Sequence, residues 1–130
     1  MVVDTSAIAA ILFGESEAPA FLRALASTEA KNMSAVGHLE SAIAVEARKG
    51  EAGAKAYAGL LAQAGVEVVA FDASQAEVAL DAWRRYGKGR HPAALNLGDC
   101  AAYALAAVSN QALLFKGEDF SKTDIAERRT

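Results

Sequence analysis

The chain has 130 residues, 53% of them hydrophobic, and a formal net charge of −3. This length is enough for one domain with a sizeable core, and the composition excludes a disordered chain. The negative charge argues against binding nucleic acid through overall charge alone, although it leaves room for a local basic patch. The single cysteine, Cys100, excludes an internal disulfide and a cysteine-based zinc site.

The N-terminal apolar run is interrupted by Asp4, so we expect no signal peptide. No apolar run approaches the ~20 residues of a membrane span. We therefore expect a soluble, cytoplasmic protein with no membrane partner, and a single domain over residues 1–130.

Strands and helices are predicted to alternate along the chain. Apolar runs predict strands at 1–3, 31–35, 66–71 and 112–115, and periodic segments predict helices at 7–13, 15–27, 36–49, 51–64, 73–86 and around Asp99. Glycines mark several predicted helix ends, at positions 14, 50 and 65. Alternating strands and helices indicate an open α/β fold whose parallel sheet is covered on both faces. The polar segment 121–130 is expected to be partly mobile.

The helical period also predicts which side chains face the core. The expected inner positions are Ala18, Phe21, Leu22 and Leu25, then Val36, Leu39, Ile43 and Ala47, then Ala76, Ala79, Leu80 and Trp83, and finally Leu97, Ala101, Ala104, Leu105 and Val108. Glu40 lies at helical spacing from Val36 and Ile43, so we expect it on the same buried face.

Four acids occupy positions that can converge in such a fold. Asp4 follows the first strand, Glu40 is on an apolar helix, Asp99 is in the first turn of a helix that Asn96 can cap, and Asp119 follows the last strand. Sites in open α/β sheets form beyond the carboxyl ends of the strands. Neighbouring carboxylates repel one another unless a cation joins them, and oxygen ligands suit Mg²⁺ or Mn²⁺. The pattern therefore predicts a metal site that can activate water against a phosphodiester.

Each of these acids also has a simpler interpretation. Asp4 can cap a helix, and Asp99 can be favoured by the helix dipole. Glu40 can pair with Arg48 or Lys49, and Asp119 can be an ordinary turn residue. The joint occurrence of all four favours the metal site over these separate explanations.

Four short motifs resemble the signature blocks of PIN-domain proteins, and in particular VapC-type toxins of bacterial toxin–antitoxin pairs. The motifs are residues 3–7 (VDTSA), 38–40 (HLE), 97–100 (LGDC) and 114–120 (LFKGEDF), in the order and spacing of that family from residue 1 to about residue 125. The resemblance implies a three-layer α/β/α sandwich with a central parallel sheet of about four to five strands. It also implies a metal-dependent endoribonuclease toxin that uses Mg²⁺ or Mn²⁺.

Carried over by position, the resemblance makes Asp4, Glu40 and Asp99 the metal-binding and catalytic acids. Many PIN domains have an acid two residues before the final Asp-Phe pair, where this chain has Gly117, so Asp119 must supply any fourth catalytic carboxylate. The family mechanism, in-line attack by activated water, leaves a 3′-hydroxyl and a 5′-phosphate.

Three polar residues are expected to support the acids. Thr5 or Ser6 resembles the hydroxyl that bonds an acid or a water in the site, and Asn96 can act in the same way or simply cap its helix. His38 is expected to be structural, and Cys100 to be a small core residue.

A basic stretch is the candidate RNA-binding surface. Its members are Arg84, Arg85, Lys88 and Arg90. Trp83 and Tyr86 interleave with these cations, an arrangement that can grip a phosphate backbone and stack bases. The simpler interpretation is a solvated helix end where cations are favoured by the dipole, with Trp83 in the core. Arg128 and Arg129 are weaker candidates for the same role.

The resemblance further implies a VapB-like antitoxin, an RNA substrate, and assembly as a homodimer and a toxin–antitoxin hetero-oligomer. Two alternatives stay open. The first is a catalytically silent PIN-fold binding module, favoured by Gly117. The second is a receiver-like phosphoacceptor domain, suggested by Asp4 and Lys116 at strand ends. It needs a phosphoryl-accepting aspartate at the end of a middle strand, where Asp72 follows Phe71, but the order and spacing otherwise fit such a domain poorly.

Overall fold

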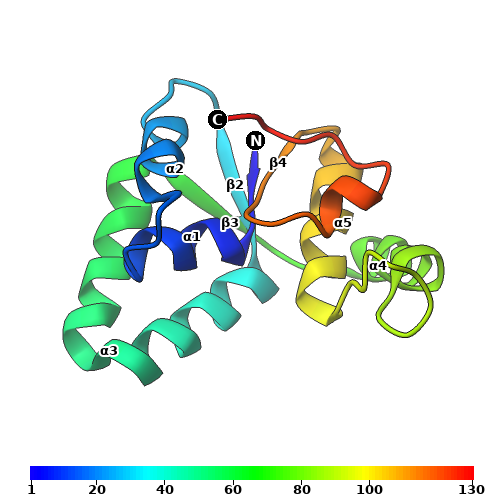
Figure 1. The fold of residues 1–130 in the computed structure, drawn as a ribbon, viewed down its shortest axis with the longest axis horizontal. Helices are drawn as coiled ribbons and strands as arrows, with labels where there is room; N and C mark the ends of the chain where they lie inside the picture. Colours follow the sequence, from blue (N-terminus) through cyan, green and yellow to red (C-terminus); the bar gives the residue numbers. More distant parts are fainter.

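Four short parallel strands form the centre of the molecule (Figure 1). The computed structural model describes all of residues 1–130. The strands are β1 (Val2–Val3), β2 (Lys31–Ser34), β3 (Val66–Val69) and β4 (Leu113–Leu114), and their order across the sheet is β3-β2-β1-β4. Every neighbouring pair is parallel, which confirms the predicted sheet.

Helices cover both faces of this sheet, so the molecule has the predicted three layers. The helices are α1 (Thr5–Leu12), α2 (Ala18–Leu25), α3 (Ala35–Ala64), α4 (Ala73–Tyr86) and α5 (Leu97–Ser109), followed by the short 3₁₀ helix η1 (Phe120–Lys122). In Figure 1, α1, α2 and α3 lie on one side of the sheet, and α4 and α5 lie on the other.

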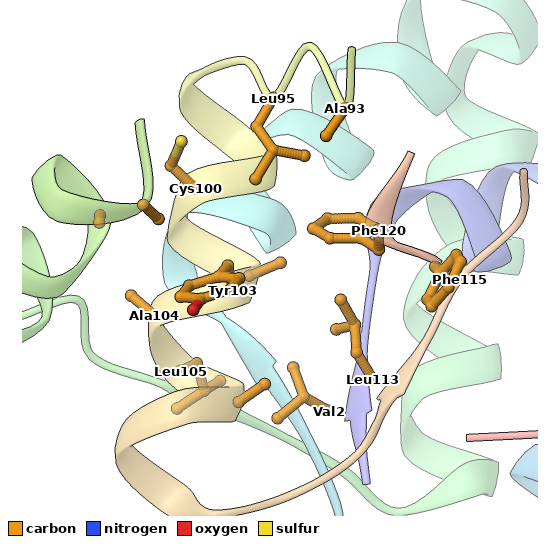
Figure 2. Close-up of a cluster of buried hydrophobic side chains, with 14 residues drawn as sticks. Val2, Ala93, Leu95, Cys100, Tyr103, Ala104, Leu105, Leu113, Phe115 and Phe120 are labelled. Carbon is orange, nitrogen blue, oxygen red and sulfur yellow. The ribbon is translucent and has the colours of Figure 1, made fainter. Parts of the chain in front are cut away.

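The core is divided into two parts by the sheet, because successive strand residues point to opposite faces. Val3 packs with α1, α2 and α3 in one cluster. Val2 belongs to the other cluster, which is built from α4, α5, β4 and the segment after it and includes Tyr103, Leu113 and Phe120 (Figure 2). β1 is therefore buried on both faces, as its wholly apolar sequence predicts.

The start of α1 differs from the prediction. The helix begins at Thr5 rather than residue 7, because Asp4 is the N-cap and its Oδ2 accepts a hydrogen bond from the Ser6 amide. Thr5 and Ser6 therefore lie in the first turn of the helix. The next helix, α2, is also shorter than expected, and it begins with Pro19 in its first turn.

Helix α3 has two arms that meet at Gly50, where the backbone leaves the helical region (φ 63°, ψ −155°). We call residues 35–49 the first arm and residues 51–64 the second arm; the two diverge in Figure 1. The sequence predicted these as two helices ending at Gly50 and Gly65, and both ends are confirmed, with Gly65 in the left-handed conformation.

The predicted inner faces are wrong at several large side chains. Leu39 and Ile43 are each 60% exposed, and Leu97 is 83% exposed. Leu22, Leu80, Trp83 and Val108 are exposed as well. The first arm instead buries Gly37, Ser41 and Val45, whereas α4 buries the predicted Ala79 together with Gln75 and Ala82. Small residues let neighbouring backbones approach closely, so they, rather than the largest apolar side chains, set the rotation of these helices.

The C-terminal segment is also more ordered than expected. After η1 the chain returns to the sheet, where Leu113 donates to Ala126 and accepts from the Arg128 amide, both at 2.8 Å. This pairing covers the outer edge of β4. Elsewhere, none of the helices combines the length and the apolar character needed to cross a membrane.

Candidate active site

Asp4 lies at the carboxyl end of β1 and is 6% exposed. Its Oδ2 accepts hydrogen bonds from the Ser6 amide (3.0 Å) and the Ser6 hydroxyl (2.6 Å). The Ser6 hydroxyl in turn accepts from the Lys116 amide at 2.9 Å, which ties Asp4 to the segment after β4. Of the two hydroxyl candidates, only Ser6 bonds an acid, because Thr5 donates to the carbonyl of Gly37 (3.3 Å).

Glu40 extends from the first arm of α3 toward the start of α5. A Cβ atom built on Gly98 would lie 1.8 Å from Oε1 of Glu40, so the carboxylate occupies space that only a glycine at position 98 leaves open. The expectation that Glu40 shares a buried face with Ile43 is wrong, because both side chains are exposed. The motif containing Gly98 was identified in the sequence, but this steric role was not. A glycine in the first turn of a helix costs about 1 kcal/mol relative to alanine. A glycine at this place in the sequence therefore indicates that another group needs the space of its side chain.

Asp99 is held by a reciprocal hydrogen-bond pair at the N-terminus of α5. Asn96 Oδ1 accepts from the Asp99 amide (2.9 Å), and Asp99 Oδ2 accepts from the Asn96 amide (3.0 Å). This capping box confirms the predicted N-cap. It fixes the orientation of the Asp99 carboxylate and also commits the Asn96 side chain to the backbone.

The three acids line one pocket with a volume of about 220 Å³. The lining residues are Asp4, Thr5, Ser6, Glu40, Asn96, Gly98 and Asp99. None of them is a cation or a hydrophobic residue, so carboxylates from the end of β1, from α3 and from α5 share a polar pocket without a compensating positive charge. We call this the acidic pocket.

The pKa values of all three acids are raised, chiefly by burial. Burial raises the pKa of Asp99 to about 6, and the charges of Asp4 and Asp119 add to that rise. The pKa of Asp4 is raised by burial and, to a smaller extent, by Glu40, against the hydrogen bonds from Ser6. Burial and the charge of Asp99 raise the pKa of Glu40. The acidic pocket thus carries a charge conflict that protons or a cation relieve.

Comparison with known families matches residues 1–126 to the PIN domain. The chain belongs to the PIN-domain family. Its similarity to curated proteins extends over nearly the whole chain. It is 52% identical over 126 residues to a ribonuclease VapC of Mycolicibacterium smegmatis, covering 97% of this chain and 98% of that one. It is 50% identical over 126 residues to ribonuclease VapC30 of Mycobacterium tuberculosis, covering 97% and 96% of the two chains.

Two solved structures share the fold of this PIN domain. Mycobacterium tuberculosis VapC20, described as a sarcin–ricin loop cleaving toxin, matches with a TM-score of 0.79 at 23% identity over 99% of this chain and 98% of that one. A chain of a toxin–antitoxin complex from Klebsiella pneumoniae matches with a TM-score of 0.70 at 17% identity, over 95% and 92% of the two chains. These likenesses confirm the expected PIN fold, and the family excludes the receiver-like alternative.

Asp119 lies outside the acidic pocket of this PIN domain. It is exposed and precedes η1, although its charge contributes to the raised pKa of Asp99. Gly117, at the position where many PIN domains have an acid, adopts φ 94°, a conformation that residues with a side chain rarely take. The backbone conformation at position 117 therefore favours glycine over the acid that many PIN domains have there.

The donor chemistry of the acidic pocket fits a hard divalent cation. Every acidic ligand candidate offers carboxylate oxygens, and Asp4 Oδ1 and Asp99 Oδ1 take no hydrogen bond within the chain. No three His, Cys, Asp or Glu side chains stand close enough together to enclose an ion directly. The carboxylates instead surround a roomy pocket, which suits Mg²⁺ because this ion keeps several waters.

The predicted RNA-binding cations are not equivalent in the PIN domain. Arg85 pairs with Asp124 at 3.1 Å and with Asp81 at 3.6 Å, so it is committed to the protein surface. Arg90 lies over the Trp83 ring, 4.8 Å from its centroid, and donates to the Arg84 carbonyl. The side chains of Arg84 and Lys88 make no ion pair.

An apolar groove of about 480 Å³ runs between α4 and α5 beside these cations. Trp83, Lys88 and Leu97 line it, and so does Asn96, which also lines the acidic pocket. Trp83 is therefore exposed in this groove rather than in the core, which corrects the simpler interpretation of that residue. Arg128 pairs with Glu29 at 2.7 Å, which removes it from the free cations.

Two expectations about side chains near the pocket are confirmed. His38 bonds another side chain rather than an acid, since its Nδ1 lies 2.8 Å from the Tyr57 hydroxyl. Cys100 is buried in the core between α4 and α5 (Figure 2).

Proposed function

We propose that this VapC-type PIN domain is a metal-dependent endoribonuclease and the toxin of a toxin–antitoxin pair. The observation that carries the proposal is the acidic pocket, where Asp4, Glu40 and Asp99 converge from three distant segments without a cation. Such an arrangement destabilises the metal-free protein and is explained by a ligand that brings positive charge.

Asp4, Glu40 and Asp99 would hold Mg²⁺ or Mn²⁺, directly or through water. A divalent ion there would neutralise the carboxylates, polarise a phosphodiester and promote attack by water on phosphorus. Asp119 stands farther out, where it adds negative potential or orients a water, and we rank it below the three acids that line the pocket.

The supporting residues act by fixing the acids before any ligand arrives. Ser6 holds one oxygen of Asp4, and Asn96 holds one oxygen of Asp99, which leaves the other oxygen of each carboxylate available. Preorganised carboxylates bind an ion without first losing side-chain freedom.

Arg84 and Lys88 are the cations we propose for contact with RNA phosphates, because neither is engaged in an ion pair. Lys88 lines the groove that adjoins the acidic pocket at Asn96. Arg85 and Arg90 rank lower, since their charges are already partnered by carboxylates or by an aromatic ring.

The VapC relatives and the structural likeness to a chain of a toxin–antitoxin complex support an antitoxin partner for this chain. A VapB-like antitoxin that closes the acidic pocket would hold the nuclease inactive in the cytoplasm. A homodimer is favoured by the exposed apolar side chains Leu39 and Ile43 on the first arm of α3, which no part of the chain covers.

The decisive experiment is RNA cleavage by the purified chain with Mg²⁺, with Mn²⁺ and with a chelator. We expect cleavage with either ion, no cleavage with the chelator, and loss of cleavage in Asp4→Asn and Asp99→Asn with the fold retained. Glu46→Gln is the matched control, because Glu46 is an exposed acid of the first arm outside the pocket. Chelator-resistant cleavage, or full activity in both aspartate variants, would contradict the proposal.

A further inference from the structure

A buried tyrosine joins the two arms of α3. Tyr57 belongs to the second arm and is 3% exposed. Its hydroxyl is hydrogen-bonded to Nδ1 of His38 on the first arm (2.8 Å), and the two rings stack with centroids 5.5 Å apart. The same hydroxyl lies 3.4 Å from the His38 carbonyl oxygen and 3.7 Å from the sulfur of Met33. Tyr57 is therefore a polar link across the Gly50 kink.

The hydrogen bond between Tyr57 and His38 lies close to Glu40 in the sequence. His38 precedes Glu40 by two residues, and Ser41 follows it directly. The Ser41 hydroxyl is buried and makes no hydrogen bond in the structure. Residues 38 and 41 are three apart and so share one helix face, and Tyr57 bonds His38 on that face.

Glu40 differs from the other acids in how it is held. A Ser6 hydroxyl orients Asp4, and the Asn96 amide orients Asp99. The Glu40 carboxylate takes part in none of the side-chain hydrogen bonds or ion pairs of the chain, and the charge of Asp99 repels it. Its position beside Gly98 therefore depends on the backbone of the first arm and on the rotation of that arm about its axis.

The first arm is fixed on two sides near Glu40. On one side Thr5 donates to the Gly37 carbonyl, and a Cβ atom on Gly37 would lie 3.4 Å from the Thr5 hydroxyl oxygen. On the other side the Tyr57 hydroxyl holds His38. Loss of either contact removes one restraint on the rotation of the arm, and a side chain as long as glutamate amplifies a small rotation at its carboxylate.

We propose that Tyr57 is a positioning residue for Glu40, acting through its hydrogen bond to His38. The hydroxyl restrains the rotation of the first arm within the packing set by its small residues, and it so directs the Glu40 carboxylate into the acidic pocket. This inference rests on the proposed function, because it concerns the same pocket and the same cation.

The test compares Tyr57→Phe with wild type by calorimetric titration of the metal-free protein with Mn²⁺ and by steady-state RNA cleavage. The variant keeps the buried ring and loses only the hydroxyl. We expect the Kd for Mn²⁺ to rise and kcat at subsaturating Mn²⁺ to fall, each by about fivefold, with KM for RNA unchanged. A merely structural role would lower the melting temperature and leave the Kd for Mn²⁺ unchanged, and that result overturns the proposal.

Tyr103→Phe is the matched control. Tyr103 is also a buried tyrosine (Figure 2), and its hydroxyl donates to Asp124 (2.5 Å); neither residue lines the acidic pocket. We expect this variant to lose stability and to keep the wild-type Kd for Mn²⁺. An equal rise in Kd in both tyrosine variants would mean that general loosening is responsible, and it would overturn the role assigned to Tyr57.

Two further comparisons separate this inference from the proposed function. In a Glu40→Gln background, Tyr57→Phe should cause no additional loss of Mn²⁺ affinity, whereas an additive loss overturns the inference. His38→Asn, which offers a polar atom near the place of Nδ1, should bind Mn²⁺ better than His38→Leu, and equal weakening of both again overturns it. If wild type binds no Mn²⁺, or Glu40→Gln binds it unchanged, the proposed function itself fails.

Discussion

Glu40 and Gly98 lie in such close contact that any side chain at position 98 would displace the glutamate. A Cβ atom there would stand 1.8 Å from Oε1 and 2.6 Å from Cδ of Glu40. The contact joins the first arm of α3 to the first turn of α5, and it brings the Glu40 carboxylate within range of the Asp99 charge. A helix without this glycine would exclude the third acid from the pocket.

Gly98→Ala should therefore reduce cleavage by about tenfold while leaving the fold intact. Position 98 is helical, where alanine is favoured over glycine, so the melting temperature should stay level or rise. Gly59→Ala is the control, because a Cβ atom on this glycine meets nothing within 4 Å. Activity kept in Gly98→Ala would show that Glu40 need not occupy its present place.

Asp119→Ala should weaken cleavage less than Asp99→Ala does. Asp119 is exposed and does not line the acidic pocket, whereas Asp99 is oriented within it by Asn96. Initial rates at several Mn²⁺ concentrations give the comparison. If both variants are equally inactive, Asp119 is a full participant in catalysis and the ranking of the four acids is wrong.

The pH dependence of cleavage should report the ionisation of Asp99. Burial raises the pKa of this carboxyl to about 6, and the cation must compete with its proton. At limiting Mg²⁺, the rate should rise with pH through about 6 and then level off. A rate that stays constant from about pH 5 to about pH 8, across the whole of this titration, would contradict the assignment.

The stability of the metal-free protein should change with pH in the opposite direction. The folded state holds the Asp99 proton more tightly than the unfolded state, whose ordinary pKa is 3.8. This contribution is present at pH values below 3.8 and is lost as the pH rises through about 6. Asp99→Asn should thus melt a few degrees above wild type at pH 7 and close to it at pH 4, apart from the hydrogen bond that both side chains can make to Asn96. Melting curves of the metal-free proteins test this, with Glu46→Gln as the control.

An antitoxin that inserts an arginine or lysine among the acids should compete with the metal. The inserted cation would replace the charge of the ion, and arginine can bond two carboxylate oxygens at once. Calorimetry should show weaker antitoxin binding in the presence of Mn²⁺ and in Asp4→Asn or Asp99→Asn. Binding should survive these changes, since apolar contacts supply most of the affinity. An affinity unaffected by metal and by both substitutions would place the antitoxin elsewhere.

Local signals in the sequence were sufficient for the order and type of most elements. Helix α4 begins and ends at the predicted residues, Asn96 caps α5, and Gly50 and Gly65 mark the ends of the two arms of α3. These features depend on neighbours within a few residues, through backbone conformation and capping hydrogen bonds, so they can be read from a short stretch of chain. The alternation of strands and helices along the chain was then enough to predict the parallel sheet.

The same reasoning placed Asp4 and Asp99 correctly at element ends, because a strand end and a first helical turn are local positions. It misplaced Glu40, since the rotation of a helix depends on its packing partners. Large apolar residues such as Leu39 and Ile43 predicted one buried face, and the close approach permitted by Gly37 and Ser41 selected another.

What only the tertiary structure decided is how the acids meet and what holds them. The contact between Glu40 and Gly98 joins segments 58 positions apart, and the Tyr57 hydroxyl reaches back 19 positions to His38. No local propensity encodes such pairs, because they exist only after the sheet has brought the helices together. The sequence by itself determined which residues could carry the chemistry, and long-range packing determined that Asp4, Glu40 and Asp99 share one pocket while Asp119 remains outside it.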